Sequence, residues 1–323
     1  MAGEIPLLCV VGPTAVGKTE IAIELAGELG GEIVSADSMQ IYKRMDIGTA
    51  KPAAAERTRA RFHLIDFVEP DEPYSVQQYQ RDAEAAIAAI HGRGALPIMC
   101  GGTGLYVNAV IDRYVFPPGD GAEGIRERLG QEAARDGPEA LHRRLQEVDP
   151  ETAARTHARN VKRVIRALEV YALTGQPISR VASVDPDGEM EYSILLMGLR
   201  RPRDELYQRI EARVDAMMGA GLLDEVAALV RSGCDRRLQS MQAIGYRQLA
   251  AHIVGELSLR DAVAAAKRDT RRYAKRQMTW FRRDRRVRWI DVSDRSGAGE
   301  AAGAIAAMWQ AQARRRDGTA LRR

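Results

Sequence analysis

The sequence has little cysteine and no long apolar run, and these absences exclude whole classes of protein. Its three cysteines, Cys9, Cys100 and Cys234, lie far apart and form no C-x-x-C pair, so neither a zinc site nor a disulfide framework is expected. No stretch of about 18 uncharged apolar residues occurs, so we expect no membrane span. The first residues lack the basic start and the small-residue cleavage site of a signal peptide. The predicted compartment is therefore a reducing cytoplasm.

Aromatic side chains are also scarce. Phe, Trp and Tyr make up 5% of the 323 residues, whereas hydrophobic residues of all kinds make up 45%. The interior must therefore be built mainly from Leu, Ile, Val, Ala and Met. The chain is long enough for one large domain, or for a core with a smaller second unit.

Positive charge is small in total but concentrated in two places. The 48 Lys and Arg against 44 Asp and Glu give a net charge of +4. Residues 267–288 nevertheless hold 11 Lys or Arg and only two acids. A second basic stretch contains Arg155, Arg159, Lys162, Arg163 and Arg166. Such clusters indicate a polyanionic partner, although a solvated helix face is the simpler explanation of an isolated run of charge.

The order of apolar runs and helical patterns predicts an α/β fold. Short apolar runs predict buried strands over residues 5–11, 32–36, 63–66 and 96–100. Helical spacing predicts helices over 18–29 and 75–91, and Ser75 with Gln78 forms a capping box at the start of the second one. Strands that alternate with helices argue for a parallel sheet with crossover helices.

The character of the sequence changes after Val115. Helical patterns follow one another without a strand until about residue 193, where a further strand is predicted over 193–199. The last third is helical, with a long helix capped by Ser258 and a final strand over 287–291. We therefore expect four parts: a first part of the core (1–115), a helical insertion (116–190), a second part of the core (191–292) and a flexible tail (293–323).

One motif carries most of the functional signal. The segment GPTAVGKT, residues 12–19, fits G-x-x-x-x-G-K-[ST] and lies between a predicted strand and a predicted helix, which is the context that a P-loop requires. Glycines let the backbone fold around phosphate oxygens, and the helix N-terminus supplies positive potential. Lys18 adds a charge, and the Thr19 hydroxyl is a ligand for Mg²⁺. A plain glycine turn is the bland alternative, and a P-loop alone would make a nucleotide kinase the default function.

Other polar residues follow the same edge of the predicted sheet. Asp37 follows the second strand, where it can accept a proton or hold a magnesium-bound water, or alternatively cap a short helix. Thr103, in GGTGLY, follows another strand and is either a substrate contact or part of a turn. Arg209 and Arg213 are four residues apart on a helix, so both can face one anion, but spacing alone favours surface charges.

The basic C-terminal segment KRQMTWFRR, residues 275–283, mixes cations with Trp280 and Phe281. Cations with interleaved aromatic rings suit RNA, through phosphate pairing and base stacking. Alternatively the two aromatic rings pack into the core while the arginines face water. One helix can serve both purposes on its two sides.

Several of these segments resemble the signature segments of the bacterial tRNA dimethylallyltransferases, also called tRNA isopentenyltransferases. They occur in order along residues 6–291 and read GPTAVGKT (12–19), SADSMQIY (35–42), MDIGTAKP (45–52), GGTGLY (101–106), QAIGYR (242–247) and KRQMTWF (275–281). The resemblance implies a P-loop α/β core with a helical insertion. It also implies that the P-loop holds the diphosphate of dimethylallyl diphosphate, with Mg²⁺, and that the acceptor is the adenosine 3′ of the anticodon in tRNA.

The resemblance also assigns roles to individual residues. The catalytic set would be Asp37 as general base, with Thr103, Lys18 and Arg213. The diphosphate would be held by Gly12, Pro13, Thr14, Ala15, Val16, Gly17, Lys18, Thr19 and Arg209, with Thr19 as the metal ligand. The tRNA would contact Asp37, Ser38, Met39, Gln40, Thr103, Arg126, Val161, Lys162, Arg163, Val164, Ile165, Gln242, Ala243, Ile244, Gly245, Tyr246 and Arg247.

Prenyl transfer to the anticodon stem-loop of tRNA is therefore the predicted function, with a monomeric enzyme as the expected state. Two alternatives come from other classes. A P-loop nucleotide or small-molecule kinase would consume ATP and needs a mobile lid, which the sequence does not reveal. A non-catalytic RNA-binding protein with the same fold would be expected to lack Lys18, Thr19 or Asp37, and all three are present.

Overall fold

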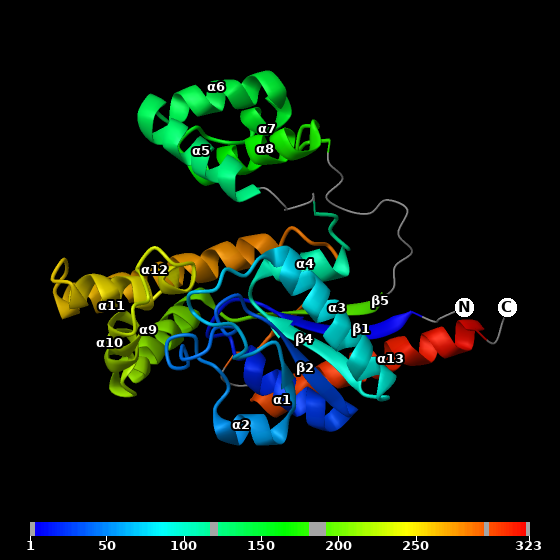
Figure 1. The fold of residues 1–323 in the computed structure, drawn as a ribbon. Coiled ribbons are helices and arrows are strands. Elements are labelled where there is room, and N and C mark those ends of the chain that lie inside the picture. Colours follow the sequence, from blue (N-terminus) through cyan, green and yellow to red (C-terminus); the bar gives the residue numbers. More distant parts are fainter. Residues whose placement is uncertain (1–3, 117–121, 181–191, 294–296, 321–323) are drawn as a thin grey trace. The chain divides into compact units, whose positions relative to one another are not determined.

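The computed structural model describes residues 4–116, 122–180, 192–293 and 297–320. The chain divides into two compact units, Met1–Ile111 with Met190–Arg323, and Asp112–Glu189 (Figure 1). The first unit contains the sheet and the second is helical.

The first unit is built on a six-stranded sheet in which every pairing is parallel. Its strand order is β3-β2-β4-β1-β5-β6. The strands are β1 (Ile5–Val11), β2 (Gly31–Ala36), β3 (Phe62–His63), β4 (Leu96–Gly101), β5 (Tyr192–Arg200) and β6 (Arg288–Asp291). The predicted α/β fold with a parallel, P-loop-like core is thus confirmed, although the third strand is shorter than expected and ends at His63.

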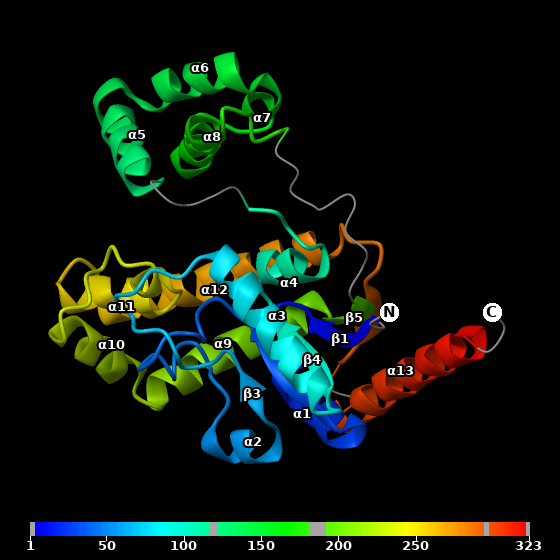
Figure 2. The ribbon, with the colours of Figure 1, turned by 45° about the vertical axis from the view of Figure 1, so that its right-hand side comes forward.

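Helices cover both faces of this sheet (Figures 1 and 2). One apolar cluster joins alternate residues of β1, such as Leu7 and Cys9, to α3 (Val76–Gly92) and α4 (Gly104–Ile111). A second cluster joins Leu8 and Val10 of the same strand to α1 (Lys18–Leu29) and α13 (Ala298–Ala320). This alternation follows from the two-residue period of a strand, and burial on both faces explains why the strands read as continuous apolar runs.

A group of helices continues from the sheet at the carboxyl ends of its strands (Figure 1). It consists of α9 (Arg203–Gly219), α10 (Leu222–Arg231), α11 (Tyr246–Ile253), α12 (Leu259–Phe281) and the short 3₁₀ turn η1 (Ser240–Gln242). The helices α9 and α10 are separate, because Gly221 has a positive φ of 98° and forms the N-cap of α10. The predicted Ser258 cap of α12 is confirmed, since its hydroxyl accepts a hydrogen bond from the Asp261 amide.

The short helix α2 (Ala54–Arg59) completes the first unit. The second unit contains α5 (Ala122–Asp136), α6 (Pro138–Val148), α7 (Pro150–Ala154) and α8 (Val161–Thr174). These helices have a small core of their own, with Leu129, Leu141, Leu145, Ala153, Val164, Ala167 and Leu168 buried. The unit begins at Asp112, four residues before the break expected at Phe116.

The expectation of a flexible tail from residue 293 is wrong for Ala298–Ala320. This segment is the helix α13, and its residues Ala301, Ala302, Ile305 and Ala306 are buried in the cluster that also contains α1. Small side chains allow a close approach between helices, so an Ala-rich stretch without a clear pattern of large apolar residues can still pack well. The final part of the predicted mobile end, residues 321–323, lies outside the described residues.

Within the described part of the chain, none of the helices combines the length and apolar character that a membrane crossing requires.

Candidate active site

Three loops meet where parallel strands end. The P-loop follows β1, Asp37 follows β2, and the turn with Thr103 follows β4, which lies between these two strands. The Thr103 amide donates a hydrogen bond to the Ala36 carbonyl at 3.1 Å and thereby joins the ends of β2 and β4. Ligands of open parallel sheets bind at this edge, so the topology brings the predicted phosphate site and the predicted base together.

The P-loop has the geometry that its glycines predict. Gly17 has a positive φ of 106° at the N-cap of α1, a conformation that side chains with a Cβ rarely adopt. The Lys18 Nζ donates to the Pro13 carbonyl at 2.8 Å, inside the curve of the loop. Burial lowers the pKa of Lys18 to about 8, while the nearby Asp37 carboxylate opposes this shift. The site therefore holds a cation that is short of an anionic partner.

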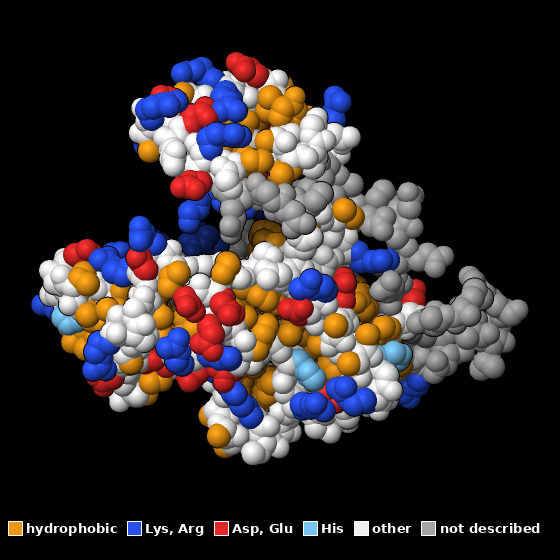
Figure 3. Space-filling view, viewed as in Figure 1, with side chains coloured by type: hydrophobic (Ala, Val, Ile, Leu, Met, Phe, Trp, Pro, Cys, Tyr) orange, Lys and Arg blue, Asp and Glu red, His pale blue; other side chains and the backbone are white. Residues whose placement is uncertain are grey.

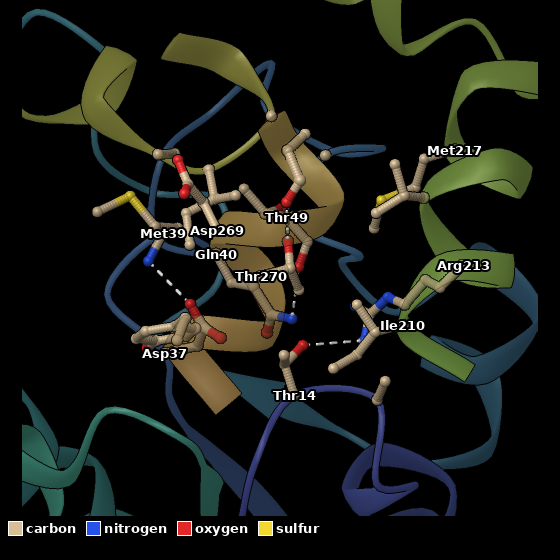
Figure 4. Close-up of a pocket in the computed structure, with 18 of the residues that line it drawn as sticks. Thr14, Asp37, Met39, Gln40, Thr49, Ile210, Arg213, Met217, Asp269 and Thr270 are labelled. Carbon is tan, nitrogen blue, oxygen red and sulfur yellow. Dashed lines mark hydrogen bonds between the residues drawn. The ribbon is translucent and has the colours of Figure 1, made fainter. Parts of the chain in front are cut away.

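Two arginines from α9 face the P-loop. The Arg209 Nε donates to the Ala15 carbonyl at 3.0 Å, and the Arg213 Nη1 lies 3.4 Å from the Thr14 hydroxyl (Figure 4). Burial lowers the pKa of Arg213 from its ordinary range, whereas Asp37 opposes this effect. The interpretation of these arginines as surface charges, which spacing alone favoured, is wrong, because α9 packs its polar face over the loop.

Asp37 and Thr103 lie on neighbouring turns. One carboxylate oxygen of Asp37 accepts the Met39 amide at 2.9 Å (Figure 4). The Thr103 hydroxyl accepts the Ser38 amide at 3.1 Å. Asp37 thus closes a turn, because no helix begins at this position. Its carboxylate still lines the cavity and is close enough to influence the pKa of Lys18 and Arg213.

The Gln40 side chain makes its hydrogen bonds within the protein. Its amide nitrogen donates to the carbonyls of Thr49 and Ala50, at 3.2 and 3.1 Å, and its oxygen accepts from Ser35 at 3.2 Å. The loop that receives these bonds is held in turn by Lys51, whose Nζ contacts oxygens of Asp46 and Asp66 at 2.6 and 2.7 Å. Lys51, which belongs to the segment 45–52, therefore has a structural role.

A cavity of about 690 Å³ joins these groups. Its polar lining includes Thr14, Lys18, Thr19, Asp37 and Arg213 near the P-loop, and further polar and charged residues of α12. An apolar wall comes from the helices beyond the sheet and contains Ile210, Val214, Met217, Met218, Leu222, Leu249, Val263 and Ala266 (Figure 4). A charged end beside an apolar wall suits a ligand with an anionic head and a short hydrocarbon tail.

Sequence reasoning missed two side chains of α12 at this site. Gln277 is 5% exposed, accepts the Thr14 amide at 2.8 Å and donates to the Gly102 carbonyl at 2.9 Å. Tyr273 lies one turn earlier, beside Asp37 and Thr103; burial and the Asp37 charge raise its pKa to about 12, so its phenol stays protonated. Both residues lie within the basic stretch 267–288. The clustered charge of this stretch points to its Lys and Arg residues, and no local pattern indicates that an uncharged residue there faces the site.

The segment 242–247 is divided between surface and core. Gln242 and Arg247 are exposed, and Arg247 pairs with Asp269 at 3.1 Å. Tyr246 is fully buried, so the expected tRNA contact is wrong for its side chain, whereas Ala243 is 6% exposed and lines the cavity. The Tyr246 hydroxyl bonds instead to Glu225.

Glu225 organises this region. Its carboxylate accepts the backbone amides of Asp46, Ile47 and Gly48 at 2.8, 2.8 and 3.2 Å, in addition to the Tyr246 hydroxyl. The loop that supports Gln40 is therefore fixed to α10 and to the start of α11.

The other candidate tRNA residues lie in the helical unit. Lys162 and Arg163 are exposed on α8, whereas Val161 and Ile165 are half-buried. Val164 is fully buried in the core of the unit, so its expected side-chain contact with tRNA is wrong. Lys and Arg side chains spread over the face of this unit that is in view in Figure 3.

Arg126 makes a double hydrogen bond with Glu169, at 2.6 and 3.3 Å, and Arg166 shares the same carboxylate at 3.0 Å. Glu169 is fully buried, yet the Arg126 side chain remains 56% exposed. The carboxylate fixes two guanidinium groups near the surface of the helical unit.

No group of three or more His, Cys, Asp or Glu among the described residues is arranged to hold a metal ion. Thr19 and Asp37 both line the cavity. Mg²⁺ typically takes one or two protein oxygens and fills its other positions with water and substrate phosphates. The Thr19 hydroxyl fits a magnesium ion that arrives with a diphosphate.

Comparison with known proteins decides the family. The family described as IPP transferase matches residues 40–284, and that described as isopentenyl transferase matches residues 5–72. The chain is 49% identical to a tRNA dimethylallyltransferase of Pelotomaculum thermopropionicum, over 90% of this chain and 91% of that protein. It belongs to the IPP transferase family. A tRNA dimethylallyltransferase of Geobacillus kaustophilus is 50% identical, over 88% of this chain and 90% of that protein.

Solved structures of IPP transferases agree. The tRNA isopentenylpyrophosphate transferase of Bacillus halodurans superimposes with a TM-score of 0.71 at 42% identity, covering 97% of this chain and all of the other. A eukaryotic dimethylallyltransferase acting on tRNA gives a TM-score of 0.74 at 27% identity, covering 90% of this chain and 75% of the other. The suspected family is thereby confirmed, and the alternative of a kinase is not favoured.

Proposed function

We propose that this chain transfers the dimethylallyl group of dimethylallyl diphosphate to N6 of the adenosine 3′ of the anticodon in tRNA, and releases diphosphate. The observation that carries the proposal is the single cavity that joins the P-loop, Asp37 and an apolar wall. A five-carbon chain on a diphosphate suits both the apolar wall and the charged end of this cavity.

The chemistry can be assigned to residues. The adenine amine attacks C1 of the donor, a C–N bond forms, and the C1–O bond breaks with its electron pair moving to the diphosphate. Lys18, Arg213 and the P-loop amides stabilise the charge that develops on this leaving group. The Asp37 carboxylate takes the proton that the amine loses.

We further propose that Mg²⁺ accompanies the donor. Its chemistry is to neutralise diphosphate oxygens as a Lewis acid, and Thr19 would hold it there, which leaves the Asp37 carboxylate to act as the base. If so, Thr19→Ala raises the magnesium concentration needed for half-maximal activity. An unchanged magnesium titration would argue against ligation by Thr19.

The acceptor must enter as an unstacked base. Flipping costs a few kcal/mol and costs least in a single-stranded loop, which favours the anticodon loop over a duplex. Basic side chains of α12 and α8 offset this cost through the RNA backbone. A monomeric state and a cytoplasmic compartment remain predictions.

The test is incubation of the purified protein with unmodified tRNA, Mg²⁺ and radiolabelled dimethylallyl diphosphate in the absence of ATP. We expect label in acid-precipitable RNA and release of diphosphate. A parallel reaction with ATP but no prenyl donor serves as the control for kinase or ATPase chemistry. ATP turnover without labelled RNA would overturn the proposal.

A further inference from the structure

Gln277 lies between two loops: the P-loop, or donor loop, and the turn at Gly102 and Thr103, or acceptor turn. Its side-chain oxygen accepts the Thr14 amide of the P-loop at 2.8 Å, and its nitrogen donates to the Gly102 carbonyl at 2.9 Å. One buried amide group therefore bridges two loops that would bind different substrates.

The packing leaves this bridge little freedom. Gln277 is 5% exposed, and a Cβ added at Gly102 would lie 2.2 Å from its amide nitrogen and 3.2 Å from the Gly12 carbonyl oxygen. Gly102 is thus required for close approach. Because the amide is oriented by one donor and one acceptor, its oxygen and nitrogen cannot exchange places without losing both bonds.

Thr103 follows Gly102 directly and bonds to the turn that carries Asp37, a residue that lines the cavity. Its hydroxyl accepts the Ser38 amide at 3.1 Å, next to Asp37. Any shift of the Gly102 carbonyl relative to Thr14 therefore changes the distance between the proposed base and the diphosphate loop. Transfer requires the attacking and attacked atoms about 3–3.5 Å apart, and a misplacement of about 1 Å can cost about 100-fold in rate.

We propose that Gln277 is a positioning residue that holds the donor loop and the acceptor turn in register for prenyl transfer. The inference rests on the proposed function and adds a residue to it. Gln277 touches neither the reacting carbon nor the amine in this scheme. Gln277 lines the cavity, but both ends of its amide group bond to the protein, so we expect its effect mainly in kcat rather than in the affinity for either substrate.

The first test is Gln277→Leu, which keeps the approximate size of the side chain and removes both hydrogen bonds. We expect kcat to fall about 10- to 100-fold, with KM for donor and RNA within about threefold of wild type. Gln312→Leu is the matched control, because Gln312 also bridges two elements, through a 3.0 Å bond to the Ile194 carbonyl, away from the cavity. Unchanged kcat in Gln277→Leu, or an equal loss in Gln312→Leu, would overturn the proposal.

Gln277→Glu supplies a readout that a purely structural role would not move. The ionised carboxylate still accepts the Thr14 amide but cannot donate to Gly102, whereas the protonated carboxyl can do both. The kcat of Gln277→Glu relative to wild type should therefore rise as the pH falls. A ratio independent of pH, in a variant whose thermal melting shows it to be folded, would contradict the assignment.

Wild-type protein assayed in parallel distinguishes a failure of the proposed function from a failure of the positioning role. Absence of prenyl transfer by wild type would reject the proposed function itself. Transfer by wild type with unimpaired Gln277 variants would reject only the positioning role.

Discussion

At the scale of single residues, the site depends on opposite charges placed close together and partly away from water. The Asp37 carboxylate favours the charged forms of Lys18 and Arg213, while burial disfavours them. Lys18 and Arg213 therefore stay available to pair with an incoming diphosphate, because their existing partners neutralise their charge only in part. Local sequence identified Lys18 and Asp37, since both follow strands within recognisable segments, but the inward direction of Arg213 required the packing of α9.

The role of Asp37 as a base can be separated from its role in the turn. Asp37→Asn keeps an oxygen for the Met39 amide, which Asp37 accepts at 2.9 Å, but removes the basic carboxylate. We expect turnover to fall about 100- to 10,000-fold, as is usual for loss of a general base, with binding of donor and RNA retained. Single-turnover kinetics with saturating substrates measures this. Near-normal rates would remove Asp37 from the base role.

The lowered pKa of Lys18 predicts how donor binding responds to pH. Because the free protein holds the pKa of Lys18 at about 8, the side chain loses its proton as the pH rises through that value. A diphosphate prefers the ammonium form, so donor affinity should be constant below about pH 8 and fall above it. Titration calorimetry without RNA, from about pH 6.5 to about pH 9.5, measures the effect.

Lys18→Met is the control for this titration. It should bind the donor more weakly throughout and lose the inflection near pH 8, since it has no proton to lose at this position. A wild-type affinity that stays flat across the same range would show that Lys18 does not titrate on binding.

At the scale of elements, the strands and the first helices could be predicted and several later features could not. Ile5–Val11 and Lys18–Leu29 were predicted to the residue because both faces of the sheet are buried and the P-loop fixes where the helix starts. The short helices α4 and α11 follow glycine turns and are stabilised by tertiary packing, which leaves a weak local pattern. Gln277 makes its hydrogen bonds to residues far away in the sequence, so no spacing rule could place it.

The helix α13 was the clearest failure of prediction, and its packing can be tested. Ile305 is fully buried in the cluster with α1, whereas Met308 on the same helix is 38% exposed. Ile305→Ala should lower the free energy of unfolding by about 2–5 kcal/mol through lost burial and an unfilled cavity. Met308→Ala should change it by less than about 0.5 kcal/mol. Urea unfolding of the two variants makes the comparison, and equal small effects would mean that α13 contributes little to the fold.

At the scale of the whole molecule, the cavity and the exposed cations of α8 belong to different units. The sheet unit contains the cavity and all of its lining residues. The helical unit has its own core and presents cations on α8, while a buried carboxylate, Glu169, fixes Arg126 and Arg166. Composition and the missing strands predicted a separate helical segment, but the partner of Arg126 could be found only from the packing of α5 against α8.

Salt dependence tests whether the helical unit contacts RNA. If Lys162 neutralises a phosphate, Lys162→Gln should reduce the slope of log affinity against log salt by about 0.7 for single-stranded RNA and weaken binding to all tRNAs alike. Glu147→Gln, at another exposed position of the same unit, is the control and should leave the slope unchanged or steepen it slightly. Filter binding across a salt series measures the slopes, and identical slopes for Lys162→Gln and wild type would exclude this contact.

The central claim is that a C–N bond forms at one adenine. The most direct measurement is nucleoside analysis of tRNA after reaction with dimethylallyl diphosphate and Mg²⁺, beside a tRNA in which guanosine replaces the adenosine 3′ of the anticodon. The account predicts N6-dimethylallyladenosine at that position in the first RNA and no prenylated nucleoside in the second. Prenylation of another nucleoside, or equal prenylation of both RNAs, would contradict it.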